Sequence, residues 1–146
     1  MRDGLGPARL RLQGGNVADE FGRRFGPDGR AKVLAGEVVD ADGAVIESTT
    51  TMPAGAHVFL YREVPDEVEV PFDMPVLYRD DDIVVVDKPH FLATMPRGGH
   101  VVQTALVRLR RCLDLPELSP AHRLDRLTAG VLLFTARREV RGAYQT

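Results

Sequence analysis

The chain has 146 residues and a formal net charge of −2, with 44% hydrophobic and 27% charged residues. This balance is that of a globular protein with one domain, or with one small module and part of another, and it excludes a wholly disordered chain. Met1 is followed by Arg2 and Asp3 rather than by a signal-peptide core, and no apolar run approaches the roughly 18 residues that span a bilayer, so we expect a cytoplasmic protein without a membrane partner.

Two short helices are predicted in the first third of the chain. Residues 1–15 are rich in glycine and follow no sustained period, which predicts an extended or loose start. Asn16 is a suitable N-cap for a short helix, and the Gly-Pro-Asp-Gly sequence at residues 26–29 would end it. A second short helix is expected through residues 31–34.

Strand patterns follow these helices. Residues 37–46 contain two apolar stretches around the dipeptide Asp42-Gly43, which is a strong signal for a β-hairpin. Residues 57–62 have the composition of a further strand. We therefore expect residues 1–63 to form a small helix-hairpin module.

A change in composition marks the predicted domain boundary. Residues 64–75 contain three prolines among acidic side chains, which predicts a linker or an extended crossing segment. Two apolar stretches after it, at residues 76–78 and 83–86, predict strands that a turn over residues 79–82 separates. A second domain is thus expected over residues 76–146.

The second domain also carries a helical pattern and a longer strand. Apolar residues at helical spacing predict an amphipathic helix from about residue 100 to residue 113, with Arg108, Arg110 and Arg111 pointing largely outward. The continuous apolar run over residues 130–135 predicts a buried strand. The order of all these elements predicts an α+β fold rather than a regular βαβ arrangement.

Charge is distributed unevenly along the chain. Acidic residues dominate between residues 63 and 82, whereas arginine dominates between residues 97 and 141. An arginine-rich second half would permit a surface that faces RNA phosphates. Solvated helix faces are the simpler explanation of the same pattern.

The segment over residues 121–134, AHRLDRLTAGVLLF, carries the clearest chemical signal. It places the carboxylate of Asp125 between Arg123 and Arg126, in a loop that leads directly into a predicted strand. Flanking guanidinium groups favour an ionised carboxylate at neutral pH, which suits a nucleophile or a general base. Without further information, such an Arg-x-Asp-Arg cluster is more often a structural ion-pair site.

The run HRLDRLTAGVLLF resembles the catalytic motif of the RluA-type RNA pseudouridine synthases. In that motif His/Asn-Arg-Leu-Asp is followed by Thr or Ser, a small residue, Gly and an apolar strand. The resemblance implies that Asp125 is the catalytic aspartate and that Arg123 helps to extrude the target nucleotide. His122 and Arg126 are expected to contact RNA, with Arg126 holding a phosphate or the loop itself. Leu127 stands where the family usually has Glu.

A second match lies upstream, in the correct order. Residues 83–89, IVVVDKP, resemble the strand and Asn/Asp-Lys-Pro motif that opens the family's catalytic domain. The resemblance implies that residues 76–146 form the first part of a mixed-sheet catalytic domain. Lys88 is expected either to reach the RNA backbone or to support the catalytic loop. The chain departs from the family at His90 and at Met95-Pro96, where the family usually has Gly and His-Pro.

Two further segments resemble parts of the same enzymes. Residues 137–144 resemble the start of the helix that follows the catalytic strand. Residues 16–63 resemble the small α-L RNA-binding module that is often fused to the catalytic domain. A cap that packs on the catalytic domain without contacting RNA is the alternative for this N-terminal part.

The resemblance implies isomerisation of uridine to pseudouridine in ribosomal or transfer RNA, without a cofactor. A carboxylate could add to the uracil ring, attack the anomeric carbon or remove a sugar proton, and the sequence does not choose between these routes. A lone cysteine, Cys112, and four histidines without zinc-like spacing predict no metal site. The Lys-x-Tyr strand and the basic segment that complete the family's site do not appear before Thr146, so we expect a truncated catalytic domain.

Other classes of function compete with the isomerase. The chain could be a non-catalytic RNA-binding protein or an inactive truncated remnant, in which the arginines bind RNA and no chemistry follows. A hydrolase or kinase-like protein built on His122 and Asp125 fits poorly, because neither the kinase His-Arg-Asp order nor a Ser or Cys nucleophile motif is present.

Overall fold

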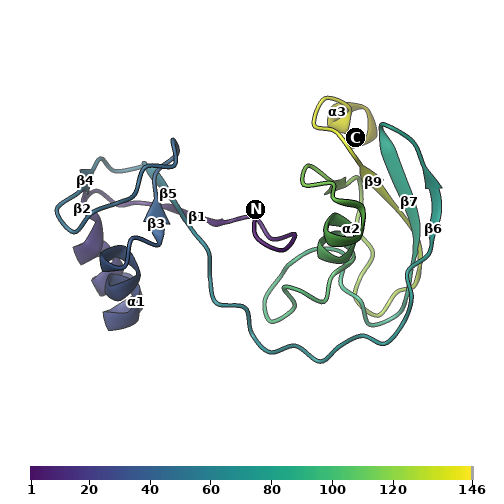
Figure 1. The fold of residues 1–146 in the computed structure, drawn as a ribbon, viewed down its shortest axis with the longest axis horizontal. Coiled ribbons are helices and arrows are strands. Elements are labelled where there is room, and N and C mark those ends of the chain that lie inside the picture. Colours follow the sequence, from purple (N-terminus) through teal and green to yellow (C-terminus); the bar gives the residue numbers. More distant parts are fainter. Residues whose placement is uncertain (146) are drawn as a thin grey trace. The chain divides into compact units, whose positions relative to one another are not determined.

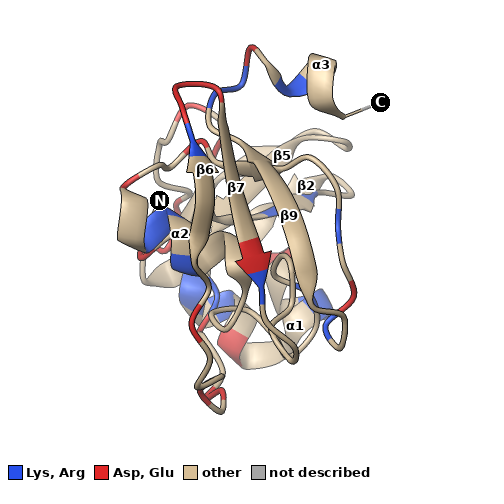
Figure 2. Cartoon of the chain, turned by 90° about the vertical axis from the view of Figure 1, so that its right-hand side faces the viewer, with Lys and Arg blue, Asp and Glu red and all other residues tan. Residues whose placement is uncertain are grey.

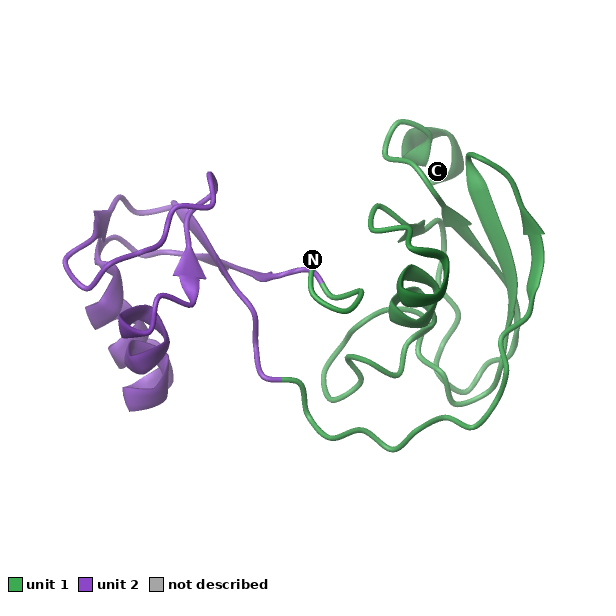
Figure 3. Ribbon diagram, in the orientation of Figure 1, with its two compact units in different colours: residues 1–5, 64–146 green, residues 6–63 purple. Residues whose placement is uncertain are grey.

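The computed structural model describes residues 1–145 and divides them into two compact units (Figure 1). The N-terminal unit consists of residues 6–63, and the C-terminal unit consists of the residues from 64 onward together with residues 1–5 (Figure 3). Within residues 1–145, no helix is both long and apolar enough to cross a membrane.

The N-terminal unit combines one long helical element with short antiparallel strands. Its three-stranded sheet has the order β1-β5-β3, and two further strands, β2 and β4, pair with each other. A core of Val17, Phe21, Val33, Val38 and Val58 lies between helix and sheet. The elements are β1 (Ala8–Arg11), β2 (Gly15–Asn16), α1 (Val17–Leu34), β3 (Val38–Val39), β4 (Thr51–Met52) and β5 (His57–Leu60).

Helix α1 consists of two helical stretches joined at a kink. The Asn16 side chain accepts a hydrogen bond of 2.9 Å from the Asp19 N–H, which confirms the predicted N-cap. Gly26 has φ 73° and ψ −164°, a conformation that interrupts the helix, and Pro27 follows at a position where its missing N–H is not needed. The two predicted short helices are therefore present, and the second folds back on the first, since Arg30 pairs with Asp19 and Gly29 lies against Phe21 and Phe25.

The strand predictions for this unit were only partly correct. Residues 1–15, expected to be loose, contain β1, whose four residues pair with β5 over the register Ala8↔Leu60 to Arg11↔His57. The expected turn exists, because the Asp40 N–H donates to the Ala44 carbonyl at 2.9 Å. Beyond the turn Val39 bridges Val45 and the Ile46 N–H donates to the Val38 carbonyl at 2.9 Å, so a short hairpin forms, and β3 pairs with β5 as well.

The C-terminal unit is built on a four-stranded sheet of order β6-β7-β9-β8. All strand pairs among the described residues are antiparallel, and an isolated parallel bridge joins Ala93 to Thr104. With its helices, the structure confirms the α+β class. The elements are β6 (Val76–Arg79), β7 (Ile83–Lys88), α2 (Ala105–Leu113), β8 (Ser119–Pro120), β9 (Gly130–Thr135) and α3 (Arg141–Tyr144).

Helix α2 covers one face of this sheet (Figures 1 and 2). Its buried residues Leu106 and Leu109 pack in one core with alternate residues of β7 and β9, namely Val84, Val86, Leu132 and Phe134. The opposite face is open, since Val131 and Tyr78 are each more than half exposed. The apolar run of β9 thus belongs to a strand that is buried on one side only.

The boundaries of α2 differ from the prediction. The helix begins at Ala105 rather than near residue 100, because the Thr104 hydroxyl caps it by accepting from the Val107 N–H. Its arginines do not simply point outward. Arg108 donates to the carbonyls of Val70 and Phe72, and Arg110 donates to the carbonyl of Leu118. These guanidinium groups therefore bind the backbone of neighbouring segments.

Residues 64–75 form no helix or strand, and they lie along the C-terminal unit. The Glu67 carboxylate accepts hydrogen bonds of 2.7–2.9 Å from the N–H groups of Val101, Val102 and Gln103. Burial raises the pKa of Glu67, but these three donors and the nearby His100 outweigh it, so the pKa lies below its usual value of 4.5. Glu67 and Arg108 together fasten this segment to the rest of the unit.

Candidate active site

The register between β7 and β9 brings the two motifs of the sequence together. Lys88, at the end of β7, lies opposite Gly130, at the start of β9, and the loop with Asp125 immediately precedes Gly130. Gly130 has φ 144°, a conformation that L side chains rarely adopt. The antiparallel pairing therefore places the Asp-Lys-Pro segment beside the loop over residues 121–129, at one end of the sheet.

Backbone hydrogen bonds define the shape of the 121–129 loop. The Ala121 N–H donates to the Leu133 carbonyl at 2.9 Å, and the Thr128 N–H donates to the Asp125 carbonyl at 3.0 Å. His122 Nε2 accepts a hydrogen bond of 3.1 Å from the Leu133 N–H. In this contact Nε2 is the ring nitrogen that carries no proton. His122 thus contributes to the structure of the loop, while its ring remains exposed.

A buried threonine holds the middle of the same loop. The Thr94 hydroxyl donates to the Leu124 carbonyl at 2.7 Å, and its oxygen accepts from the Leu124 N–H at 3.1 Å. Thr94 is only 4% exposed. Leu124 directly precedes Asp125, so this two-way contact fixes the backbone that carries the carboxylate.

Lys88, at the end of β7, has no exposed surface. Its ammonium donates to the carbonyls of Leu92 at 2.7 Å and Pro89 at 3.1 Å. Burial lowers the pKa of Lys88, and the negative charge of Asp125 acts in the opposite direction. An ammonium bound to these two carbonyls does not reach an RNA backbone in this arrangement, so its position favours the supporting role.

The Asp125 carboxylate itself is open to solvent. Its side chain is 83% exposed, and Oδ1 lies 3.7 Å from Nη2 of Arg123, whose side chain is 58% exposed. An ion pair with this exposure contributes little to stability. The pair is therefore poorly explained as a structural ion-pair site, whereas an accessible carboxylate on a fixed backbone is suited to act on a bound ligand.

A cavity of about 260 Å³ adjoins this carboxylate. Arg123, Asp125 and Arg126 line it together with Thr94 and His100. Figure 2 shows the acidic turn between β6 and β7 at the end of the sheet where β7 begins, away from Lys88. The site and its arginines are thus at the opposite end of the sheet from that acidic turn.

Residues 82–146 match the family model described as RNA pseudouridylate synthase. The matched segment contains the β7 motif, the 121–129 loop and β9, in the order and the proximity described above. This part of the chain belongs to the RNA pseudouridylate synthase family. The predicted resemblance to the RluA-type enzymes is thereby confirmed.

Several curated proteins of this family resemble the chain. An uncharacterised RNA pseudouridine synthase of Synechocystis is 36% identical over 65% of this chain and 33% of its own length. Ribosomal large subunit pseudouridine synthase D of Pseudomonas aeruginosa is 28% identical over 82% of this chain and 41% of its own length. A human pseudouridylate synthase is 40% identical over 51% of this chain and 13% of its own length.

Among solved structures, the human RNA pseudouridylate synthase domain containing protein 4 matches with a TM-score of 0.40 at 27% identity. That match covers 48% of this chain and 27% of the other. The chain spans less than half the length of the curated relatives named here.

Sequence reasoning placed Asp125, Arg123 and Arg126 in one loop, and the structure places all three on the wall of one cavity. It missed two residues that position this loop. Thr94 carries no motif that marks it, and His90, whose Nδ1 lies 2.8 Å from the Leu127 carbonyl, was noted only as a departure from the family. Within residues 1–145, no group of three or more histidine, cysteine, aspartate or glutamate side chains is arranged to hold a metal ion.

Proposed function

We propose that this chain contributes the catalytic aspartate of an RNA pseudouridine synthase and that this residue is Asp125. The observation that carries the proposal is an exposed carboxylate on a backbone that buried Thr94 fixes, beside two arginines and a cavity. Family membership of residues 82–146 supports the same reaction. In the reaction the N1–C1′ bond of uridine breaks, a C5–C1′ bond forms, N1 gains a proton and C5 releases one to solvent.

The surroundings of Asp125 suit a uridine that has left the RNA stack. A base must be extruded before its ring or its anomeric carbon can meet a carboxylate, and positive side chains at the entrance can hold the displaced phosphates. Arg123 and Arg126 are both exposed and flank Asp125 in sequence. We assign Arg123 to the space that the base vacates, Arg126 and His122 to contact with the RNA backbone, and Lys88 to support of the loop.

The substrate is proposed to be ribosomal or transfer RNA. The names of several relatives, including synthase D of Pseudomonas aeruginosa, refer to the large ribosomal subunit. Fragments of large-subunit ribosomal RNA are therefore the first substrates to test, and transfer RNA is the second. We propose further that residues 1–63 form a separate module that assists RNA binding and that residues 76–146 carry the catalytic part.

The decisive experiment compares Asp125→Asn with Asp87→Asn. Both changes remove one carboxylate charge from an exposed side chain in the same region of the unit. Each is made in the full chain and in a chimaera in which residues 76–146 replace the matched segment of synthase D of Pseudomonas aeruginosa. Pseudouridine is measured by tritium release from 5-tritiated uridine in RNA and by chromatography of nucleosides.

Loss of product with Asp125→Asn, together with retained product in Asp87→Asn, is the expected result, while RNA affinity stays within about twofold. Product formation by Asp125→Asn would refute the assignment. RNA binding without any product in the unsubstituted chimaera would favour a non-catalytic RNA-binding protein, which is the alternative function.

A further inference from the structure

Phe91 has an unusual backbone conformation directly after the Asp-Lys-Pro segment. Its φ is +68°, in the left-handed region that large side chains rarely adopt. The other described non-glycine residues with positive φ are Asp3 and Asp114, and aspartate tolerates this region far better. A strained aromatic residue persists only where its surroundings impose the conformation, and such residues cluster at functional sites.

The surroundings of Phe91 do impose its conformation. The buried Lys88 ammonium binds the carbonyls of Pro89 and Leu92, which lie on either side of the His90-Phe91 pair. His90 also contacts the Leu127 carbonyl in the loop of Asp125. The turn is thus tied both to the end of β7 and to the candidate catalytic loop.

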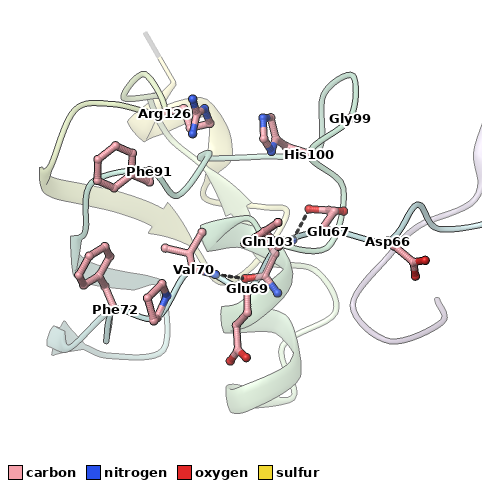
Figure 4. Close-up of a pocket in the computed structure, with 12 residues that line it drawn as sticks. Asp66, Glu67, Glu69, Val70, Phe72, Phe91, Gly99, His100, Gln103 and Arg126 are labelled. Carbon is pink, nitrogen blue, oxygen red and sulfur yellow. Dashed lines mark hydrogen bonds between the residues drawn. The ribbon is translucent and has the colours of Figure 1, made fainter.

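This conformation leaves the Phe91 ring at the surface rather than in the core. The ring is stacked with that of Phe72, with 6.3 Å between the ring centroids and 27° between the planes. Phe91 is 50% exposed and Phe72 is 47% exposed. The two rings line a cavity of about 430 Å³ (Figure 4).

This cavity adjoins the cavity beside Asp125, because Arg126 and His100 line both. Figure 4 shows Arg126 and Phe91 toward one side of the cavity and Asp66 toward the other. Of its acidic residues, Glu67 is fully engaged by three backbone N–H groups, whereas Asp66 and Glu69 are exposed. The positive side of the cavity is therefore the side that adjoins the candidate active site.

We propose that Phe91 and Phe72 form a platform on which an unpaired nucleobase next to the target uridine stacks, with Arg126 at its phosphate. This inference rests on the proposed function and extends it to a neighbouring nucleotide. Aromatic rings beside a guanidinium group are the chemistry by which proteins hold splayed, single-stranded RNA bases. A duplex offers no such base, so the platform selects unpaired RNA.

The test compares Phe91→Tyr with Phe91→Leu in the full chain. Both replacements keep a side chain with the same backbone strain, so the aromatic ring is the main difference between them. The probe is a fluorescein-labelled oligouridylate of about 12 nucleotides, a length within the range that single-stranded sites cover. Fluorescence anisotropy gives its dissociation constant, and Tyr78→Leu serves as the control because Tyr78 is a comparably exposed aromatic residue on β6, at 53%.

Phe91→Leu should weaken binding of the oligouridylate on the order of tenfold, the usual effect of losing one stacked base. Phe91→Tyr and Tyr78→Leu should leave the affinity within about twofold. A pre-formed RNA duplex should bind Phe91→Leu and the unsubstituted chain equally. Equal oligouridylate affinity for Phe91→Leu and Phe91→Tyr would overturn the proposal and leave the ring pair as packing between two loops.

A further variant separates binding from strain. Phe91→Gly removes both the ring and the reason for the strain, since glycine adopts positive φ freely. The melting temperature of Phe91→Gly should not fall below that of Phe91→Leu. The Phe91→Gly variant should nevertheless bind the oligouridylate as weakly as Phe91→Leu does. Strong binding by Phe91→Gly would likewise overturn the platform.

Failure of this inference differs from failure of the proposed function. If the chimaera forms pseudouridine and Phe91→Leu binds normally, the platform is wrong and the isomerase stands. If Phe91→Leu binds weakly but no pseudouridine forms with any sequence, the platform serves an RNA-binding protein and the isomerase fails.

Discussion

Thr94 and Leu124 exchange two hydrogen bonds, from the hydroxyl to the Leu124 carbonyl at 2.7 Å and from the Leu124 N–H to the hydroxyl oxygen at 3.1 Å. One side chain therefore satisfies both backbone groups of the residue before Asp125. Thr94 comes from the segment after β7, and Leu124 comes from the segment before β9. The contact joins the segment after β7 directly to the loop that carries Asp125.

Thr94→Val should loosen the loop of Asp125 while it keeps the volume of the side chain. Leu124 would lose both partners, which costs about 1–3 kcal/mol of unfolding free energy. A displaced carboxylate should also lower kcat of the chimaera by about tenfold or more, since small misplacements of catalytic groups are costly. Thr94→Ser keeps the hydroxyl and should recover most of kcat. Equal kcat for the Val and Ser variants would contradict this role.

Lys88→Met should distinguish the two roles considered for this lysine. The change keeps the apolar stem but leaves the Pro89 and Leu92 carbonyls without the ammonium, which costs about 1–3 kcal/mol. The melting temperature should therefore fall, whereas the salt dependence of RNA binding should stay the same because no phosphate contact is lost. A shallower salt dependence, with an unchanged melting temperature, would show instead that Lys88 contacts RNA.

Replacement by alanine should change RNA binding at Arg126 and stability at Arg108. Arg126→Ala should reduce the slope of log K against log salt concentration by about 0.7, the contribution of one phosphate in single-stranded RNA. Arg108→Ala should leave this slope unchanged and lower the melting temperature, because its guanidinium binds the Val70 and Phe72 carbonyls. The two measurements are anisotropy titrations at several salt concentrations and thermal unfolding. A change of slope in both variants would contradict the structural role of Arg108.

Glu67→Gln should reveal a stabilisation that depends on pH. The pKa of Glu67 lies below its usual value of 4.5 in the folded protein, because the N–H donors of residues 101–103 outweigh the effect of burial. The folded protein therefore binds this proton less readily than the unfolded chain does. The Glu67 carboxylate therefore contributes its full stabilisation above the pKa of the unfolded chain. This stabilisation is lost as pH falls through the pKa of the folded protein.

At pH 7 the Gln variant should be less stable by about 1–2 kcal/mol, since charge-assisted hydrogen bonds are replaced by neutral ones. The difference should shrink steadily as pH falls below about 4.5, and urea unfolding at several pH values measures it. A difference that stays constant down to pH 3 would contradict this account. Glu69→Gln, an exposed neighbour, is the matched control.

Local patterns identified much of the framework. The cap at Asn16, the break at Gly26-Pro27 and the strands β6, β7 and β9 follow from turn chemistry, backbone restrictions and apolar periodicity, which act over a few residues. Strand β1 was missed because glycines flank it and its stability comes from pairing with β5, about fifty residues away in sequence. The start of α2 was placed too early because Val102 fits the helical period of the residues after it, whereas Thr104 is the N-cap of the helix.

The sequence by itself determined the family and pointed to Asp125, because a short motif keeps its residues in a fixed order along one loop and strand. Only the tertiary structure decided how that loop is held. Thr94 and His90 act through contacts between segments that pairing of β7 with β9 brings together, and such contacts leave no spacing in the sequence. The strain at Phe91 is likewise imposed from outside its own residue, by an ammonium and a turn.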